Sequence, residues 1–498
     1  MASCNDTHKI SYENTIAEQA QLIVIMVPFP AQGHLNQLLQ LSCLISSYGI
    51  PVHYVGSAIH NRQAKVRANS LNPLDVVKLH FHDLSTPAFD SPPPNPNSTN
   101  KFPVQLQPVW YTMLSLRQPV AEYLKHISMQ AKRVVVIHDS LMSVVVQDIA
   151  SIPNADSYVF NCISAYFHSS FELESLGKPF PIEQPKNVPS FEGCFSDDLL
   201  KIIALQDEPM KYRAGDIFNT CRALEGPFID LIEREGAAEN RKLWAIGPIL
   251  PSKSLSDNSQ HKCLEWLDKQ ARNSVIYVSF GTTTSLSDEE IKELAMGLEQ
   301  SKQKFIWVLR DADKGNVFDG EVRRAELPDG FMERVKGLGM VVRDWAPQPE
   351  ILAHPSTGGF MSHCGWNSCI ESITMGVPIA AWPMHSDQPR NSVLITEIWK
   401  TGLIVREWGR REELVKASTI ENVVRRLMAL EEGNTIRKRA EELAAAVRQS
   451  TEEGGVSKVE LDSFIAHITG QNMDCVSPTS ISIPSSSACN NSSHASAA

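Results

Sequence analysis

The chain has 498 residues, of which 42% are hydrophobic and 21% charged, and its formal net charge is −11. This length allows two large domains with their own cores, and the apolar content excludes a wholly disordered chain. The acidic balance disfavours a nucleic-acid-binding protein, which normally presents a basic face. The ten cysteines are sparse and form no CxxC pair, so neither a disulfide framework nor a zinc ribbon is predicted.

The two ends of the sequence differ in composition from the rest. Residues 1–20 are polar and lack the apolar stretch of a signal peptide, and no apolar run reaches the 18 residues of a membrane span. Residues 471–498 are rich in serine and hold one charged residue, Asp474. We therefore expect a soluble, cytoplasmic protein with a polar N-terminal extension and a disordered tail.

Short β-branched runs alternate with helical patterns, which predicts parallel sheets wrapped by helices. The runs with the near-continuous apolar character of doubly buried strands are 22–27, 51–56, 134–137, 157–160, 274–280, 304–309, 339–345, 358–362 and 378–383.

The proline-rich stretch 85–103 is expected to form a surface loop, and the Pro- and Ser-rich stretch 247–262 to be a linker. We predict an α/β protein with two Rossmann-like, doubly wound domains, 21–246 and 263–470, facing across a cleft. The last helix could return to the first domain.

In the first domain, one histidine and one aspartate follow predicted strands. His34 lies in the loop after the first strand, and Asp139 follows a later one, at the edge where open α/β sheets bind ligands. A histidine oriented by a carboxylate is a working general base. A lone histidine is more often structural, and the chain has fifteen. His138 is expected to pack or hydrogen-bond locally.

In the second domain, a buried strand, a tight turn and a helix ending at Gly376 follow one another. The helix begins near Gly365, Asn367 and Ser368, and its free backbone N–H groups suit a phosphate. His363, in the turn, could add a donor or a positive charge.

Further polar and aromatic side chains of the same stretch suit the other parts of a nucleotide sugar. Glu371 lies four residues after Asn367, on the same helix face, and could accept two hydrogen bonds from a ribose diol. Trp345 ends a strand and could stack on a base, while Asp387 and Gln388 suit sugar hydroxyls. Each residue alone could be a core anchor, a helix cap or a turn residue, but that interpretation explains the set poorly.

Residues 345–388 resemble the signature box of plant UDP-glycosyltransferases, enzymes with the two-domain GT-B fold. The elements Trp-Ala-Pro-Gln, His-Cys-Gly-Trp-Asn-Ser, Glu and Asp-Gln all match. The turn 279–284, SFGTTT, matches a further phosphate-side loop of the family. The resemblance implies that Trp345, Ala346 and Gln348 contact uracil and that Glu371 binds the ribose. It implies that the diphosphate is held by His363, Gly365, Asn367, Ser368, Gly281, Thr282 and Thr283. The donor sugar would face Trp366, Asp387 and Gln388.

The first domain is similar to the zeatin O-glucosyltransferase group of that family, through GHLNQLLQL (33–41), IHDSLMSVVVQDIA (137–150) and HFHDLSTPAFDSPPPNPN (80–97). The resemblance implies that His34 and Asp139 are the catalytic pair of an inverting O-glucosyltransferase that uses UDP-glucose, with Gln388 typical of glucose users. From the residues themselves we expect no metal, because HExxH is absent and His363, Cys364 and Cys369 lack a zinc spacing. We also expect a monomer with no nucleic-acid or membrane partner.

The acceptor is left open between a zeatin-type cytokinin and a flavonoid, a terpenoid or another phenolic. Its pocket is expected to involve loops near 85–103, 161–171 and 180–200, with Phe102, Tyr166, Phe167 and Phe195 as candidate aromatics.

Other function classes fit less well. A nicotinamide dehydrogenase would need a third glycine after Gly337 and Gly339, and that pair precedes a strand instead of following one. A serine hydrolase would need GxSxG, which does not occur. A non-catalytic sugar-nucleotide sensor remains a rival, which the presence of both His34 and Asp139 disfavours.

Overall fold

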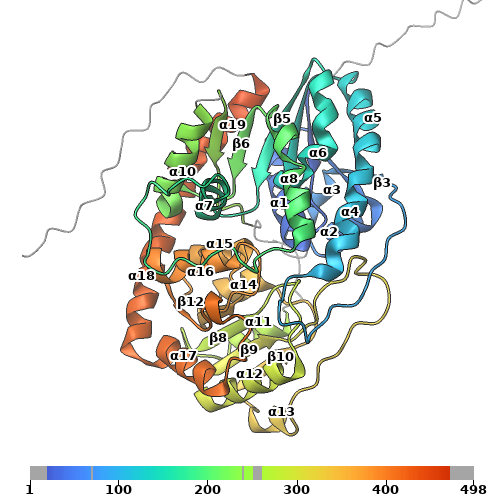
Figure 1. Cartoon of the computed structure of the whole chain (residues 1–498). Helices are drawn as coiled ribbons and strands as arrows, with labels where there is room; N and C mark the ends of the chain where they lie inside the picture. The colour runs from blue at the N-terminus through green and yellow to red at the C-terminus, as the bar shows by residue number, and fades with distance from the viewer. Residues whose placement is uncertain (1–19, 69–70, 238–239, 251–260, 471–498) are drawn as a thin grey trace, which may run out of the picture.

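The computed structural model describes residues 20–68, 71–237, 240–250 and 261–470 (Figure 1). The predicted extension apart from Ala20, the predicted tail and most of the predicted linker lie outside these residues. The described chain forms two parallel sheets, of seven and six strands. Among its helices, none is both long and apolar enough to cross a membrane.

The first sheet has the order β3-β2-β1-β4-β5-β6-β7. Its strands are β1 (Ala20–Val27), β2 (Val52–Ser57), β3 (His80–Leu84), β4 (Ala131–Asp139), β5 (Ala155–Asn161), β6 (Gly215–Phe218) and β7 (Lys242–Ala245).

The second sheet has the order β10-β9-β8-β11-β12-β13. Its strands are β8 (Val275–Ser279), β9 (Lys304–Val308), β10 (Gly339–Val342), β11 (Thr357–Ser362), β12 (Ile379–Ala381) and β13 (Gly402–Ile404).

Helices cover the faces of both sheets (Figure 1). They are α1 (Gln32–Ser47), α2 (Ala58–Val66), α3 (Pro73–Val77), α4 (Gln107–Met113), α5 (Arg117–Ser128), α6 (Ser143–Val146), α7 (Ala165–Ser175), α8 (Asp197–Ala204), α9 (Asp207–Met210), α10 (Arg222–Ala237), α11 (Lys262–Leu267), α12 (Asp288–Ser301), α13 (Phe331–Arg334), α14 (Gln348–Ala353), α15 (Trp366–Met375), α16 (Gln388–Val393), α17 (Ala417–Ala429), α18 (Glu431–Thr451) and α19 (Val456–Thr469). Short 3₁₀ segments span Val104–Leu106, Leu114–Leu116, Ser140–Met142, Gln147–Ser151 and Trp408–Arg410, and a π-helical turn spans Leu394–Ile398.

In both sheets the strand order reverses beside the first strand, between β1 and β4 and between β8 and β11. The chain leaves the carboxyl ends of these strands for the loops that carry the predicted site residues. Ligands of doubly wound sheets bind at this reversal point. The topology therefore places the two predicted motifs at equivalent positions of their sheets.

Each of the nine predicted apolar runs contains a strand, but four strands were not predicted: β3, β6, β7 and β13. β3 and β7 are edge strands with polar residues, and β6 and β13 have four and three residues. A short or edge strand needs no continuous apolar run, because too few of its residues are buried on both faces of the sheet for such a run to appear in the sequence.

The last helix, α19, packs against the first sheet although it follows the second in sequence (Figure 1). The Phe464 ring lies 5.1 Å from that of Trp244 and 5.6 Å from that of Tyr158. Arg133 donates hydrogen bonds to the carbonyls of His467 and Ile468, at 2.9 and 2.8 Å. The core of the first sheet is thus completed by the end of the described chain.

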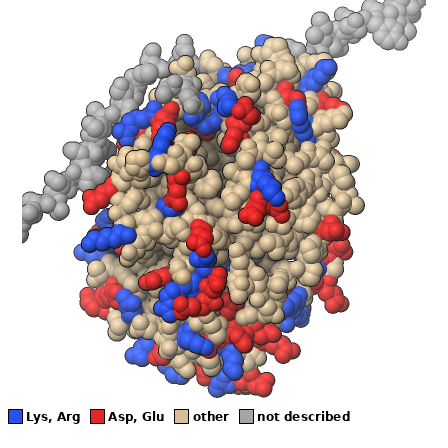
Figure 2. Space-filling view, in the orientation of Figure 1, with Lys and Arg blue, Asp and Glu red and all other residues tan. Residues whose placement is uncertain are grey.

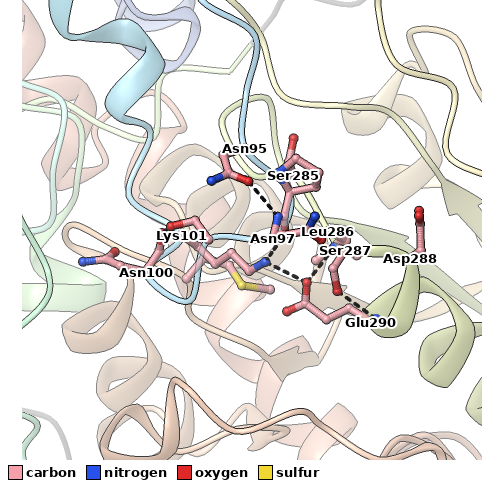
Figure 3. Close-up of polar contacts among 12 residues, drawn as sticks. Asn95, Asn97, Asn100, Lys101, Ser285, Leu286, Ser287, Asp288 and Glu290 are labelled. Atoms are coloured by element: carbon pink, nitrogen blue, oxygen red, sulfur yellow. Dashed lines mark hydrogen bonds and ion pairs between the residues drawn. The ribbon is translucent and has the colours of Figure 1, made fainter.

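The proline-rich segment 85–103 contains no helix or strand, but its end is not a free surface loop. Lys101 Nζ lies 2.7 Å from Glu290 Oε2, on the first turn of α12, and also donates to the Pro96 carbonyl at 2.8 Å (Figure 3). The Lys101 and Glu290 side chains are only 6% and 10% exposed. Glu290 also accepts from the backbone N–H of Ser287 at 2.8 Å. The segment therefore crosses to the second domain and is held there by a buried ion pair.

Candidate active site

A cleft with a volume of about 300 Å³ lies between the carboxyl ends of the two sheets. His34 and all the predicted donor-binding residues line it, whereas Asp139 lies behind His34 and is fully buried. On the face shown in Figure 2, basic and acidic side chains of the described residues are interspersed, with no continuous basic patch. The sequence motifs of both domains thus converge on one site.

His34 lies in the first turn of α1, two residues beyond the helix start, and not in the preceding loop as expected. Its Nδ1 is 2.6 Å from Oδ2 of Asp139, the last residue of β4. The other carboxylate oxygen accepts the backbone N–H of Leu141 at 3.0 Å. Because Nδ1 is engaged, Nε2 is the nitrogen left for a ligand in the cleft.

Burial and the neighbouring charges set the protonation of this pair. Burial alone would lower the pKa of His34, but the Asp139 carboxylate outweighs it and Asp387 adds to it, so the pKa of His34 is raised above 6.5. Burial would likewise raise the pKa of Asp139, but His34 outweighs it and the pKa falls below 3.8. The arrangement is that of a base oriented by a carboxylate.

His138, next in the chain, is placed differently. It is 2% exposed, and its Nδ1 lies 2.9 Å from the Asp139 backbone carbonyl. Burial lowers its pKa to about 4. The local packing role expected from the sequence is confirmed.

Cys162 completes a group of three potential metal ligands with His34 and Asp139, whose ligand atoms lie within 4.8 Å of one another. The Cys162 thiol donates to Asp139 Oδ2 at 3.3 Å. Burial raises the pKa of this thiol well above its ordinary value, so the sulfur keeps its proton. Metal ligation needs a thiolate, and we therefore interpret the group as a hydrogen-bonded cluster.

In the second domain, the ring of His363 fits between two glycines. A Cβ atom at Gly281 or at Gly365 would lie 2.6 Å from His363 Nε2, and Gly281 has a positive φ of 73°. Cys364, between His363 and Gly365, also has a positive φ, of 67°. The turn thus brings backbone close to the ring, and α15 begins directly after it with no side-chain cap. Such an N-terminus suits a phosphate.

The two histidines of the phosphate region are neutral at neutral pH. Burial lowers the pKa of His363 to about 4, so the positive charge that the sequence allowed is absent without a ligand. The pKa of His385 falls to about 3, by burial and then by the nearby His363. His385 Nε2 lies 3.1 Å from Thr283 Oγ1. His385 Nδ1 lies 2.8 Å from Ser386 Oγ, so both nitrogens of this ring already have partners among the described residues.

Several predicted donor-binding side chains contact one another. Gln348 Nε2 donates to Glu371 Oε2 at 2.7 Å and to Ser368 Oγ at 3.0 Å. Burial raises the pKa of Glu371 to about 7. The Asn367 amide donates to the Gly33 carbonyl, in the first domain, at 2.9 Å. The ribose and diphosphate positions expected from the sequence therefore form one connected polar surface.

The residues expected at the donor sugar are also hydrogen-bonded. Asp387 accepts from Asn391 at 2.7 Å, and burial raises the pKa of Asp387 to about 6. The Gln388 side-chain carbonyl accepts from the backbone N–H groups of Met384 and His385, at 2.9 and 3.0 Å. Its NH₂ group makes longer contacts, of 3.4 Å, with the two ring nitrogens of His385. Trp366 is 3% exposed and donates its indole N–H to the Asn219 carbonyl at 2.9 Å.

Trp345 lies in a loop, because β10 ends at Val342 and the predicted strand 339–345 is therefore too long. The guanidinium carbons of Arg67 and Arg310 lie 5.0 and 5.4 Å from the centre of its ring. Arg67, from the first domain, also donates to both carboxylate oxygens of Asp313, at 2.5 and 2.9 Å. No sequence pattern pointed to Arg67, since its contacts with Trp345 and Asp313 form only between the domains.

The three loops expected at the acceptor pocket reach the cleft, since Phe102, Ile163 and Leu199 line it, but most of the expected aromatic residues do not. Of the four candidate aromatics, only Phe102 lines the cleft. Tyr166 is fully buried and bonds Gln184, while Phe167 and Phe195 pack in a cluster with Phe171 and Phe191. The apolar residues that do line the cleft beside Phe102 include Phe29, Leu106, Trp110, Leu141 and Leu199. Phe29 lies two residues after the carboxyl end of β1, which is the signal that could have identified it.

Comparison with known proteins agrees with this geometry. Residues 20–251 match the family described as glycosyltransferase, N-terminal domain, and residues 252–427 match UDP-glucoronosyl and UDP-glucosyl transferase. The chain is 54% identical over 467 residues to zeatin O-glucosyltransferase of Phaseolus lunatus, covering 92% of this chain and 99% of that protein. The chain belongs to the UDP-glycosyltransferase family. This glycosyltransferase is also 53% identical over 462 residues to zeatin O-xylosyltransferase of Phaseolus vulgaris, covering 91% and 99%.

Solved structures show the same fold as this glycosyltransferase. A transferase from Siraitia grosvenorii in complex with UDP has a TM-score of 0.72 at 29% identity, covering 90% of this chain and 100% of that chain. A Phytolacca americana enzyme complexed with UDP-2fluoro-glucose and pterostilbene has a TM-score of 0.70 at 27% identity, covering 90% and 99%. The glycosyltransferase therefore has the predicted GT-B fold, and it is a transferase of the class that uses UDP-sugars.

Proposed function

We propose that this glycosyltransferase transfers glucose from UDP-glucose to a hydroxyl of a small, largely apolar acceptor, with inversion at the anomeric carbon. A zeatin-type cytokinin is the first candidate acceptor. The observation that carries the proposal is the His34–Asp139 pair, 2.6 Å apart. His34 is in the same cleft as the polar donor-binding residues and the apolar group around Phe102 and Trp110.

In the proposed reaction, His34 Nε2 accepts the proton of the acceptor hydroxyl. The hydroxyl oxygen then forms a bond to the anomeric carbon while the bond from that carbon to the UDP oxygen breaks. A single in-line displacement inverts the configuration. Asp139 keeps the histidine in the required tautomer and stabilises the imidazolium that forms.

The leaving diphosphate gains negative charge as the bond breaks. The chain offers it the backbone N–H groups at the start of α15, the side chains of Asn367 and Ser368, and the loop Gly281–Thr283. Preorganised donors of this kind are commonly a large part of catalysis in a site shielded from water. We propose that these groups stabilise the leaving group without a metal ion.

For the donor sugar, xylose is the second candidate. Glucose is favoured by Gln388, because the family resemblance associates this residue with glucose users. Backbone N–H groups bond the side-chain carbonyl of Gln388 and not its NH₂ group. Xylose is favoured by the relative named zeatin O-xylosyltransferase, at 53% identity. Asp387 and Gln388 would bind either sugar through its hydroxyls.

We further propose that the protein acts as a cytoplasmic monomer. One chain supplies both the catalytic pair and all the proposed donor contacts, so no second copy is needed to complete the cleft. Gel filtration with light scattering would test the monomer, and imaging of a fluorescent fusion would test the compartment.

The test of the function is product formation. The purified protein is incubated with UDP-glucose or UDP-xylose and a panel containing zeatin, a flavonol, a terpene alcohol and a simple phenol, and products are identified by mass spectrometry. We expect a zeatin glucoside, and a loss of about 10²–10⁴ in rate for His34→Ala with UDP affinity unchanged. Binding of UDP-glucose with no transfer to any acceptor would favour the sensor instead, and full activity of His34→Ala would contradict the mechanism.

A further inference from the structure

The catalytic pair is the end of a longer chain of buried hydrogen bonds. Asp139 Oδ2 accepts from His34 Nδ1 at 2.6 Å and from the Cys162 thiol at 3.3 Å. Cys162 follows directly after β5 and is 6% exposed. The orientation of the Asp139 carboxylate therefore depends on where the Cys162 residue is held.

Gln37 holds that residue. It lies on α1, three positions after His34, and is 2% exposed. Its side-chain N–H donates to the Cys162 backbone carbonyl at 3.2 Å, and its side-chain carbonyl accepts from the Asn219 amide at 2.9 Å. Both ends of this amide are used, as a buried polar group requires. Gln37 thus connects the helix of His34 to the ends of β5 and β6.

Asn219 continues the chain into the second domain. It follows directly after β6, and its side-chain carbonyl accepts the backbone N–H of Ile249 at 2.8 Å. Its backbone carbonyl accepts the indole N–H of Trp366, the first residue of α15, at 2.9 Å. The helix whose N-terminus faces the donor site is therefore linked, through Asn219 and Gln37, to the residue that bonds Asp139.

We propose that Gln37 is a positioning residue for the transfer reaction, fixing the His34–Asp139 pair relative to the donor helix α15 through Cys162 and Asn219. The inference rests on the proposed function, because it assumes that His34 is the base. A base and an electrophile held by different domains must keep a defined separation, and a misplacement of 1 Å can cost about 10²-fold in rate. The amide fixes both of its neighbours at once.

The first test compares Gln37→Met with a matched control, Gln206→Met. Gln206 is also a fully buried glutamine of the first domain with both ends of its amide bonded, to Val144 and Ile202, but it is not part of the cleft. We measure the melting temperature, kcat and KM with a hydroxyl acceptor, and kcat with an acceptor that is ionised in advance, such as an acidic phenol.

We expect both variants to lose melting temperature, but only Gln37→Met to lose about 10-fold to 100-fold in kcat with a hydroxyl acceptor. Its KM for UDP-glucose should change little, and its kcat with the ionised phenol should fall much less, because that acceptor needs no base. A kcat of Gln37→Met equal to that of Gln206→Met would overturn the proposal.

The second test needs no change at Gln37 and serves if that variant does not fold. Cys162→Ser keeps a hydrogen-bond donor toward Asp139, whereas Cys162→Ala removes it. With one donor fewer, the Asp139 charge acts more strongly on His34, so the acid limb of the kcat/KM profile should move to higher pH in Cys162→Ala and stay in place in Cys162→Ser. Identical profiles for the wild type and both variants would overturn the link from Gln37 to the pair.

His34→Ala, measured in parallel, separates this inference from the proposed function. If His34→Ala transfers glucose at the wild-type rate, the proposed function's mechanism is wrong and the inference is wrong with it. If His34→Ala is inactive while Gln37→Met matches its control, only the positioning role is wrong.

Discussion

The side-chain amide of Asn367 donates to the backbone carbonyl of Gly33, 2.9 Å away, and Gly33 directly precedes His34, the proposed base. The contact joins the donor helix of one domain to the first turn of α1 in the other. An asparagine NH₂ group has a second N–H, so Asn367 can donate to a diphosphate without releasing Gly33. In the proposed mechanism, donor binding and placement of the base therefore share one side chain.

Replacing Asp139 by Asn should shift the pH dependence of catalysis. The carboxylate is what keeps the pKa of His34 above 6.5 against the effect of burial. In Asp139→Asn that charge is gone, so the pKa of His34 should fall and the acid limb of the kcat/KM profile should move to lower pH. We also expect a lower kcat, because an amide can favour the wrong tautomer and does not stabilise the imidazolium. An unmoved acid limb would show that another group titrates there.

Glu371 should make donor affinity depend on pH. Burial raises its pKa to about 7, and the ionised form is the better acceptor for ribose hydroxyls. The affinity for UDP-glucose should therefore rise as the pH increases through about 7. UDP-glucose is the better probe than UDP, whose terminal phosphate itself titrates in this range. Calorimetry on Glu371→Gln is the control, and a pH dependence as steep as that of the wild type would assign it to a different group.

Replacing Asp387 by Ala should weaken UDP-glucose binding but not UDP binding. The side chain is proposed to bond sugar hydroxyls, and losing a hydrogen bond to a charged group costs about 1.5–3 kcal/mol, or roughly 10-fold to 150-fold in affinity. Asp387→Asn is the milder comparison, since it retains a polar side chain opposite Asn391. Equal weakening of UDP and UDP-glucose would place Asp387 at the nucleotide or in the packing of α16.

Removing the charge of Lys101 should destabilise the protein. Lys101→Met leaves the buried Glu290 carboxylate without its ion-pair partner, which costs about 3–5 kcal/mol. Lys101→Met combined with Glu290→Gln should regain part of this loss, because the unpaired Glu290 charge is then absent. Denaturant unfolding measures both. The control is Lys78→Met. The Lys78 side chain is 57% exposed, so its ion pair with Asp75 should contribute at most about 1 kcal/mol. An equal effect at the two lysines would mean that the Lys101 pair is solvated.

The sequence predicted the parts of the site that are local. The proposed donor-binding residues from Trp345 to Gln388 lie in one continuous segment that contains β11, α15 and β12, so the sequence pattern alone places them at one sheet edge. His34 and Asp139 were predictable because each lies at or just beyond the carboxyl end of a strand next to the reversal point of the same sheet.

The missed residues depend on contacts between distant segments. Arg67 reaches Trp345 only across the domain interface, and Cys162 reaches Asp139 only because β4 and β5 are neighbours. Tyr166 and Phe167 illustrate the opposite error, since both were expected at the acceptor pocket and neither lines the cleft. Both belong to α7, and an aromatic residue on a helix beside the cleft can equally face the core, as both do here. Sequence periodicity does not say which apolar face meets the ligand.

The return of α19 to the first sheet means that neither half of the polypeptide is an independent folding unit. A chain cut between residues 250 and 261 would leave the first sheet without Phe464 and Ile468, which are fully buried, and so with an apolar surface uncovered. The other half would carry that helix with nothing to pack on. Produced as two separate chains, the halves should therefore recombine, each supplying what the other lacks, whereas the first half alone should aggregate.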